Sequence, residues 1–287
     1  MRRLRNWLLF FIVVLIWSSN WAVMKSGLSY VEPLTFVFHR FLFSSLFLAP
    51  SIIILSGRIP RKRGDLARLL LLGVINTSGI LSTNIGLVGE KSGLSAVVTY
   101  TQPLFVFCMA IPFLNERAKI SKIVGVLIGF LGVVVISLRG KMLLDNLTSS
   151  ILFLLLGAFL WAVSTVYYKK FLSHLDPIIV NVFQMSFGAL LLGLPLFSSG
   201  GLIFPASTDY LLKVLYASIG ASAIALTIWI HLLREEEATV LSSSSLIVPM
   251  IALFFGWLLL EEAVEFQALI GAVLVIFGVY LVNRAER

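Results

Sequence analysis

Hydrophobic residues occur along this chain in long blocks separated by short polar connections. Each block has roughly 18–22 residues, the length of α-helix that crosses about 30 Å of hydrocarbon. Lipid leaves no partner for free backbone groups, so a series of such blocks predicts a bundle of membrane-spanning helices. The pattern predicts ten spans, over residues 7–25, 33–55, 67–88, 94–113, 120–138, 150–168, 177–197, 210–231, 239–260 and 264–282.

Composition supports this interpretation. Hydrophobic residues make up 59% of the chain and charged residues 13%, whereas about a quarter of an ordinary globular chain is charged. Little sequence remains between the blocks, so we expect no soluble catalytic domain. The predicted fold class is an all-α membrane protein with ten transmembrane helices.

The formal charge of +8 is distributed unevenly along the chain. If the N-terminus is cytoplasmic, sixteen Lys and Arg residues fall in cytoplasmic segments and five in outer ones. This asymmetry predicts a multi-pass protein of the cell membrane with both termini cytoplasmic. The basic residues then set orientation in the lipid bilayer and give no reason to expect nucleic-acid binding. The five outer residues are Lys25, Lys91, Arg139, Lys141 and Lys213.

The chain also contains an internal repeat. At an offset of 144 residues several identities align in order, and further along the offset becomes 146. The halves cover residues 1–140 and 150–287, with five predicted spans each. Because five is odd, the second half enters the membrane from the opposite side, as in the inverted repeats of secondary transporters. The pairs are Trp17/Trp161, Lys25/Lys169, Leu28/Leu172, Ser29/Ser173, Pro33/Pro177, Pro103/Pro249, Leu114/Leu260, Glu116/Glu262, Gly125/Gly271 and Gly132/Gly278.

These features resemble the drug/metabolite transporter superfamily, specifically its EamA-like branch, over essentially the whole chain. The resemblance implies a ten-helix exporter of amino acids or other metabolites, with a cavity lined by the first four helices of each half. The halves differ chemically, because Gln184 stands where the first half has Arg40 and Phe183 where it has His39. The motifs are Trp17–Asn20, Glu32–Pro33, Arg40–Leu42, Ser92–Ala96, Pro103, Glu116 and the glycines of the fifth span, with their second-half counterparts.

Polar residues in spans one and six are candidates to contact a solute, because polar groups in hydrocarbon should face the bundle or a water-filled cavity. Trp17 and Asn20 share one helical face, and Trp161 and Thr165 share the matching face. We interpret both faces as cavity lining. Packing of the indoles in the core or at the membrane interface is the alternative.

The third and eighth spans carry further candidates. Thr77 and Asn84 share a face of the third span, with Asn76 and Thr83 on a neighbouring stripe, and Trp229 lies in the eighth span. Small polar residues also form hydrogen bonds between membrane helices without any substrate, so this alternative stays open.

Spans four and nine each contain a proline after polar residues: Tyr100 and Gln102 precede Pro103, and Ser245 precedes Pro249. Proline removes a helical hydrogen bond and kinks the helix. Breaks at equivalent places in two halves are typical of a transporter site. We predict that Pro103 and Pro249 act as hinges. A plain packing kink is the alternative.

Arg40 is a permanently charged residue well inside a predicted span, and we count it and its counterpart Gln184 among the candidate substrate-binding residues. Its guanidinium could clamp a carboxylate through two parallel hydrogen bonds. It could equally reach the outer headgroups or hold the bundle together. The role of its neighbour His39 stays open.

The acidic residues lie at span ends, which favours facilitated diffusion or exchange over a strong proton-driven pump. Glu116 and Glu262 are placed to cap the helix that follows each of them, because carboxylates favour helix N-termini. The glycines of the last span in each half suit close helix packing, either within the bundle or in a homodimer.

These observations favour a secondary transporter that exports amino acids or similar small metabolites by alternating access. We expect no enzymatic activity, no cofactor and no metal site, since the spans hold no nucleophile–base pair, paired acids or metal motif. A channel-like or membrane-embedded binding protein without active coupling is the alternative, although a pore would usually require repeated polar rings.

Overall fold

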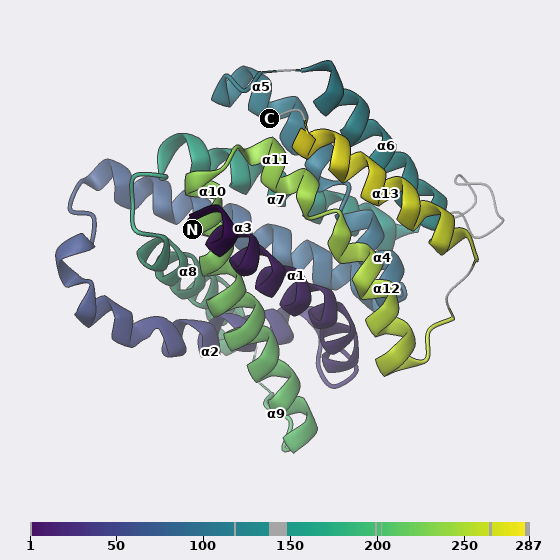
Figure 1. The fold of residues 1–287 in the computed structure, drawn as a ribbon. Coiled ribbons are helices and arrows are strands. Elements are labelled where there is room, and N and C mark those ends of the chain that lie inside the picture. Colours follow the sequence, from purple (N-terminus) through teal and green to yellow (C-terminus); the bar gives the residue numbers. More distant parts are fainter. Residues whose placement is uncertain are drawn as a thin grey trace.

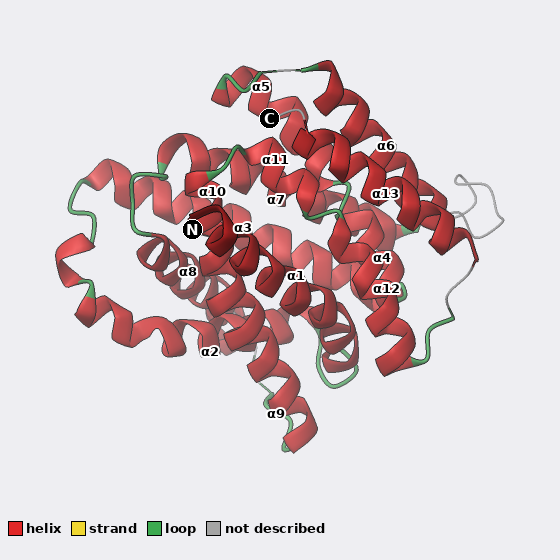
Figure 2. Cartoon of the chain, viewed as in Figure 1, coloured by secondary structure: helices red, strands yellow, loops and turns green. Residues whose placement is uncertain are grey.

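A computed structural model describes residues 2–117, 119–137, 148–198, 200–201, 203–263 and 266–284 of this chain. The described residues form helices and connections without a strand (Figures 1 and 2). Arg139, Lys141 and Arg287, three of the residues used to predict orientation, lie outside them. The helices are α1 (Arg2–Gly27), α2 (Pro33–Ile54), η1 (Ser56–Arg58), α3 (Arg63–Gly89), α4 (Ser92–Thr99), α5 (Gln102–Leu114), α6 (Ile120–Ser137), α7 (Ser149–Phe171), α8 (Pro177–Ser198), α9 (Thr208–Leu215), η3 (Tyr216–Ala225), α10 (Leu226–Glu235), α11 (Ala238–Ser244), α12 (Ile247–Leu260) and α13 (Phe266–Arg284).

Eight helical stretches in the described residues are long and apolar enough to cross a membrane, so this is an all-helical membrane protein. They correspond to the first four and the sixth to ninth predicted spans. The fifth and tenth predicted spans are also helical, as α6 and α13. The eight stretches are Leu4–Gly27, Pro33–Ile54, Arg63–Gly89, Ser92–Leu114, Ser149–Phe171, Pro177–Ser198, Thr208–Glu235 and Ala238–Leu260.

Two of these stretches are interrupted near their middle. The fourth breaks at Tyr100 and Thr101, between α4 and α5, and the eighth breaks at Ser245 and Leu246, between α11 and α12. The last residue of the first break, Thr101, lies two residues before Pro103, and the last residue of the second, Leu246, lies three residues before Pro249. The breaks thus occur where the two prolines in the sequence predict a kink. A proline has no N–H to donate to the carbonyl one turn back, so the helix loses a bond there.

A third stretch contains a wide turn that the sequence pattern did not predict. The segment η3 is a π-helix, a form usually found as short bulges at functional sites. Asn181 of α8 stabilises it, because its Nδ2 donates to the carbonyls of Ser222 (2.8 Å) and Ala223 (3.1 Å) and to Thr227 Oγ1 (2.8 Å). The carbonyls of this wide turn therefore have partners inside the bundle.

The glycines of α6 and α13 pack these two helices against each other. A Cβ added at Gly132 would meet the backbone of Gly271, and one at Gly278 would meet the backbone of Gly125 and Gly129. Glycine permits this close approach because it has no side chain. The small-residue faces are thus used within one chain, and the homodimer stays a prediction.

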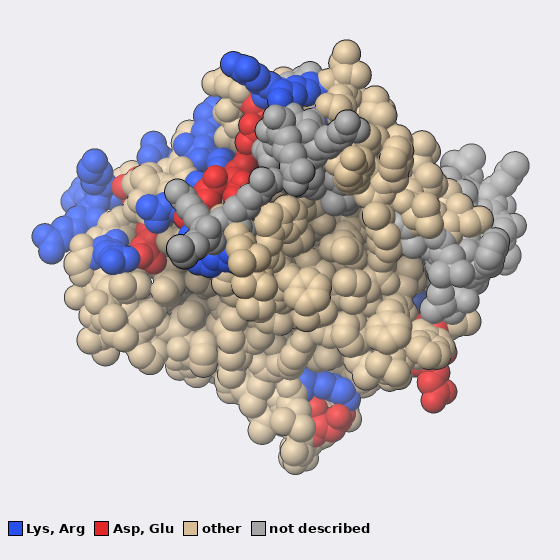
Figure 3. All heavy atoms as spheres, viewed as in Figure 1, with Lys and Arg blue, Asp and Glu red and all other residues tan. Residues whose placement is uncertain are grey.

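Polar side chains gather at the two ends of the bundle. At one end Arg58 pairs with Asp176 at 2.6 Å and Lys122 pairs with Glu237. Figure 3 shows basic side chains concentrated at this end, over the α2–α3 connection. The opposite end carries fewer charges, among them Lys25, whose Nζ donates to the carbonyls of Leu87 (2.9 Å) and Val88 (2.8 Å).

Two carboxylates cap the interrupted helices. Glu262 accepts from the backbone N–H of Ser92 (2.7 Å) and Gly93 (3.2 Å), the first residues of α4. Glu116 accepts from the N–H of Ala238 (2.7 Å) and Thr239 (3.2 Å), the first residues of α11. The prediction that each caps the helix that follows it was therefore wrong. Each caps a helix that lies more than a hundred residues away in the chain.

A left-handed residue precedes each capping carboxylate. Asn115 has φ 56° and Glu261 has φ 55°. Such residues end a helix and turn the chain sharply. The turn places the next side chain, Glu116 or Glu262, at the start of a neighbouring helix. The left-handed conformation at the end of α5 and α12 therefore explains a contact that periodicity did not reveal.

We expect Glu262→Gln to lower the thermal stability of the detergent-solubilised protein. The amide has about the size of the carboxylate but no charge, and a lost charged cap costs about 1 kcal/mol. In a chain of this size that cost lowers Tm by about 2 °C. Glu261→Gln is the control, because the Glu261 side chain is exposed. Equal shifts in the two variants would contradict the capping role.

Candidate functional site

A cavity lies within the bundle, beside the break between α4 and α5. Its volume is about 720 Å³, counting the open space at its mouth. We call it the larger cavity. It is lined by Trp17, Asn20, Trp21, Met24, Arg40, Asn76, Gly79, Ile80, Thr83, Asn84, Thr99, Tyr100, Gly157, Trp161, Ala221 and Leu226.

Helix α1 supplies one wall of the larger cavity through the face predicted from spacing. Asn20 and Trp21 lie three and four residues after Trp17, and Met24 lies three residues after Trp21, so all four lie on the same side of the helix. Trp17 is fixed there, because its Nε1 donates to the carbonyl of Ala221 at 3.2 Å. That acceptor belongs to the π-helix.

Arg40 reaches the larger cavity from α2. Its side chain is 7% exposed. The Nε donates to Ser222 Oγ at 2.5 Å, and one terminal nitrogen contacts Met24 Sδ at 3.1 Å. Both partners are neutral. The neighbouring His39 points elsewhere: its Nδ1 lies 2.7 Å from the hydroxyl of Tyr210, and it lines neither cavity.

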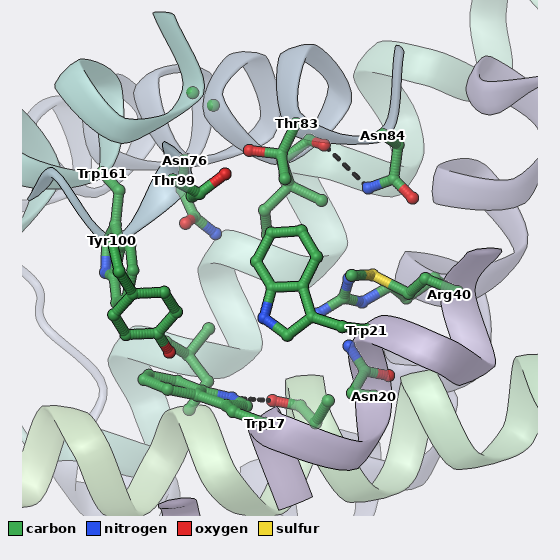
Figure 4. A pocket seen from close by; sticks show the side chains of 16 residues that line it. Trp17, Asn20, Trp21, Arg40, Asn76, Thr83, Asn84, Thr99, Tyr100 and Trp161 are labelled. Carbon is green, nitrogen blue, oxygen red and sulfur yellow. Dashed lines mark hydrogen bonds between the residues drawn. The ribbon is translucent and has the colours of Figure 1, made fainter. Parts of the chain in front are cut away.

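Aromatic rings occupy the opposite end of the larger cavity. The Trp161 ring lies 5.5 Å from Trp17, 5.3 Å from Tyr100 and 6.0 Å from Trp229, measured between centroids. Trp17 and Trp229 are 5.1 Å apart. We call these four rings the aromatic cluster. Figure 4 shows Trp17, Tyr100 and Trp161 grouped together, with Arg40 on the far side of the pocket.

A second cavity of about 310 Å³, again counting open space, also has Trp161 in its wall. We call it the smaller cavity. It shares Asn76, Trp161 and Leu226 with the larger one. Its lining is Leu72, Asn76, Trp161, Ser164, Thr165, Tyr168, Gln184, Leu226, Trp229, Ile230 and Leu233.

The structure distributes the predicted site residues among three places. Trp17, Asn20, Arg40, Asn84 and Tyr100 line the larger cavity, and Trp161 lines both cavities. The residues that line the smaller cavity are Thr165, Gln184 and Trp229. The residues that line neither cavity are Thr77, Gln102 and Ser245.

The three residues outside the cavities lie in packed surroundings. Thr77 is buried at the α3–α8 contact, where a Cβ on Gly188 would meet its hydroxyl. Gln102 Nε2 donates to Thr165 Oγ1 at 3.4 Å, next to the smaller cavity. Ser245 Oγ donates to the carbonyl of Ser242 at 2.6 Å, within the break of the ninth predicted span.

Several lining residues were not among the named substrate-binding candidates, namely Trp21, Met24, Asn76, Thr83 and Thr99, although Trp21 and Met24 belong to the face of the first span interpreted as cavity lining. A signal for them existed in the sequence. Trp21 and Met24 continue the face of Trp17, and Asn76 and Thr83 form the stripe next to Thr77 and Asn84. Adjacent stripes lie about 100° apart on a helix, so spacing alone does not select between them.

The cavity chemistry defines a class of protein. In the described residues no group of three or more His, Cys, Asp or Glu is placed to hold a metal ion. What the larger cavity offers is one cation, several amides and a set of aromatic rings, buried in a bundle of apolar helices. That combination suits the binding of a small polar solute inside a membrane.

Comparison with known proteins identifies the family. The model of the EamA-like transporter family matches residues 5–138 and 148–284. This chain belongs to that family and is a membrane transport protein of the drug/metabolite transporter type.

Two curated relatives are similar over nearly their whole length. The uncharacterized transporter YoaV of Bacillus subtilis is 28% identical over 280 residues, which cover 94% of this chain and 93% of the relative. A probable amino-acid metabolite efflux pump of Salmonella typhimurium is 28% identical over 286 residues, covering 94% and 92%. A solved crystal structure superposes with a TM-score of 0.79 at 18% identity and covers 99% of both chains, which shows a shared fold.

Two threonines of α3 test the cavity. On a Cys108→Ser background, we expect Thr83→Cys to react several times faster than Thr77→Cys with a membrane-impermeant thiol reagent. Thr83 lines the larger cavity, whereas Thr77 is 1% exposed and lines neither cavity. The rates are measured by mass shift on purified protein. Similar rates at the two positions would contradict the assigned lining.

Proposed function

We propose that this chain is a secondary transporter that exports amino acids or similar small metabolites by alternating access. Its ten helical stretches would all cross the membrane, as inverted halves 1–140 and 150–287. The observation that carries the proposal is the pair of cavities that share Trp161 in their walls. A solute that binds centrally needs access to each side of the membrane in turn.

The two cavities are lined by equivalent positions of the two halves. At the repeat offset of 144 residues, Trp17 of the larger cavity corresponds to Trp161, which also lines the smaller one, and four further residues of the larger cavity correspond to four of the smaller one. Each cavity is therefore the counterpart of the other, one wide and one narrow. In alternating access, a transporter at any one time is open on one side of the membrane and closed on the other, so one cavity should be wide and the other narrow. The corresponding pairs are Asn20/Ser164, Trp21/Thr165, Met24/Tyr168 and Arg40/Gln184.

Helix contacts support the same symmetry. Helix α1 packs on α12, and its counterpart α7 packs on α5, the counterpart of α12. Helix α3 packs on α8, and α2 packs on η3. The pairs α2/α8 and α6/α13 each join a helix to its own counterpart. A two-fold relation between halves accounts for all of these contacts.

The interrupted helices suit the role of pivot. Glu116 ties the end of α5 to the start of α11, and Glu262 ties the end of α12 to the start of α4. The fourth and ninth spans are thus joined at both ends. Rocking of the halves would then bend them at the breaks before Pro103 and Pro249, where backbone bonds are already missing.

The name of the Salmonella relative supports the amino-acid assignment, because that protein is described as an amino-acid metabolite efflux pump. The cavity supports it on physical grounds. An amino acid carries a carboxylate and an ammonium group that suit a guanidinium and amide oxygens.

Transport by the reconstituted protein tests the proposal. Proteoliposomes are loaded with an unlabelled amino acid, and entry of the labelled form is measured with and without a pH gradient. We expect saturable exchange that exceeds that of empty liposomes. No exchange for any amino acid would refute the amino-acid assignment, and uptake that does not saturate would favour the channel alternative.

A pair of tryptophans provides matched variants. We expect Trp161→Phe to reduce exchange several-fold, because each lost ring contact costs about 1 kcal/mol, and Trp161 lines both cavities. Trp257→Phe should leave exchange unchanged, since Trp257 is 51% exposed on the outside of the bundle. Equal effects of both substitutions would argue against a central role for Trp161.

Two surface positions test the proposed orientation. On the Cys108→Ser background, an impermeant reagent added to intact cells should label Ser29→Cys but not Gly57→Cys. Both positions are exposed. Ser29 lies at the end of the bundle with few charges, and Gly57 lies at the basic end, which the positive-inside rule places in the cytoplasm. The reverse labelling pattern would place the termini outside.

A further inference from the structure

We propose that the larger cavity selects solutes that carry a carboxylate on an apolar body, and that it rejects cations. Arg40 would bind the carboxylate, and the aromatic cluster would contact the apolar body. This inference rests on the proposed function, since it names the chemical class of the solute that the chain carries.

The state of Arg40 is the first observation. Its guanidinium is buried, and its two contacts are to Ser222 Oγ and Met24 Sδ. In the part of the chain that the structure describes, no carboxylate lies within ion-pair distance of it. A buried charge without a counter-ion is costly. An anionic solute would supply the missing charge.

Geometry allows a carboxylate to do so. A guanidinium has five N–H donors in a planar fork. The contacts with Ser222 and Met24 involve Nε and one terminal nitrogen, so the second terminal nitrogen makes no hydrogen bond within the described residues. Figure 4 shows the Arg40 side chain extending among the residues that line the pocket, near Asn20 and Trp21. A carboxylate could therefore bind the guanidinium from the cavity.

Unpaired amide and hydroxyl atoms are the second observation. In the described structure Asn20 Oδ1, Asn76 Nδ2, Asn84 Oδ1 and Thr99 Oγ1 are buried without a hydrogen-bond partner, and all four residues line the larger cavity. Buried polar atoms are normally paired. Asn76 Nδ2 is a donor for a carboxylate, while the two amide oxygens are acceptors for an ammonium group, so a zwitterion also satisfies them.

The charge of the lining excludes cations. Arg40 is the charged residue among those that line the larger cavity, and none of them is acidic. A solute with a net positive charge would therefore meet a like charge in a poorly screened environment. An anion or a zwitterion would not suffer this repulsion in full.

The aromatic cluster determines which kind of solute body binds, just as Arg40 determines the preferred charge. Trp17, Tyr100 and Trp161 present apolar faces and edges at the end of the larger cavity opposite Arg40, with Trp17 and Tyr100 each within about 6 Å of Trp161. Trp229, which lines the smaller cavity, packs against Trp17 and Trp161. The indole N–H of Trp17 is already engaged, because it donates to the carbonyl of Ala221. An apolar or aromatic body suits this surface better than a polar one.

Three probes of matched shape test the inference: 3-phenylpropionate, its neutral amide 3-phenylpropanamide, and the cation 2-phenylethylamine. Binding to the purified chain in nanodiscs of zwitterionic lipid is measured by titration calorimetry, with empty nanodiscs as the blank. We expect the carboxylate to bind at least about tenfold more tightly than the amide, the value of a charge-assisted hydrogen bond. The amine should bind more weakly still.

Variants of the adjacent residues Arg40 and His39 test whether the preference for a carboxylate depends on Arg40. Arg40→Gln should remove the preference for 3-phenylpropionate over its amide, and Arg40→Lys should retain part of it. His39→Gln should leave the preference intact, because His39 contacts Tyr210 and Phe204 rather than the cavity. If the Arg40 variants fail to fold, the relative affinities of the three probes for the unaltered chain still decide whether the larger cavity prefers a carboxylate.

The outcomes separate this inference from the proposed function. Binding of 2-phenylethylamine as tight as that of 3-phenylpropionate would overturn the inference, as would no binding of any probe at millimolar concentration. Transport of a cationic solute in proteoliposomes would also overturn it, yet the transporter assignment would stand. Carboxylate-selective binding without transport of any solute would instead leave the inference standing and refute the proposed function.

Discussion

The two carboxylate caps are the contacts on which the centre of this bundle depends. A helix that begins at the edge of a membrane leaves backbone N–H groups without partners, and this requirement is strict for α4 and α11, which are only one or two turns long. Glu262 and Glu116 supply the acceptors. Because each carboxylate comes from the opposite half of the chain, capping and the association of the halves are the same interaction.

The caps also position the site. Helix α4 ends at Thr99, and the residues that follow place Tyr100 against Trp161 at 5.3 Å. A helix that started elsewhere would move Thr99 and Tyr100 out of the cavity wall. The π-helix has a similar effect on the other side, where Ala221 accepts from Trp17 and Ser222 accepts from Arg40. The irregular backbone at Tyr100 and in the π-helix thus contacts the larger cavity, and Asn181 supplies part of the hydrogen bonding that the π-helix requires.

Much of the fold could be predicted from the sequence, because length and hydropathy specify membrane helices and prolines mark their breaks. The face of α1 was also predictable, since Trp17 and Asn20 follow helical spacing. Thr77 was not separable from Thr83 in this way. Both lie on α3 among small and apolar residues. Which of them faces the cavity depends on which helices surround α3, and the tertiary structure is needed to show that arrangement.

Neither the π-helix nor the identity of the capped helices could be predicted from the sequence. In both cases the deciding partner belongs to another helix. The segment Tyr216–Ala225 is composed of small and apolar residues that suit an α-helix equally well. Its wider turn depends on Asn181, a residue of another helix. Likewise, the sequence indicates that Glu116 can cap a helix but does not indicate which one. The start of α11 reaches Glu116 only in the folded arrangement of both halves.

The difference between Arg40 and Gln184 has an evolutionary consequence. In a protein made of two identical halves, every substitution would act on both sides of the membrane at once. Here Arg40 and Gln184 lie in separate cavities, so under the proposed alternating access a change at one of them would alter the environment of the solute on a single side. Divergence after duplication could therefore adjust capture and release independently, with the same scaffold and without any change in its symmetry.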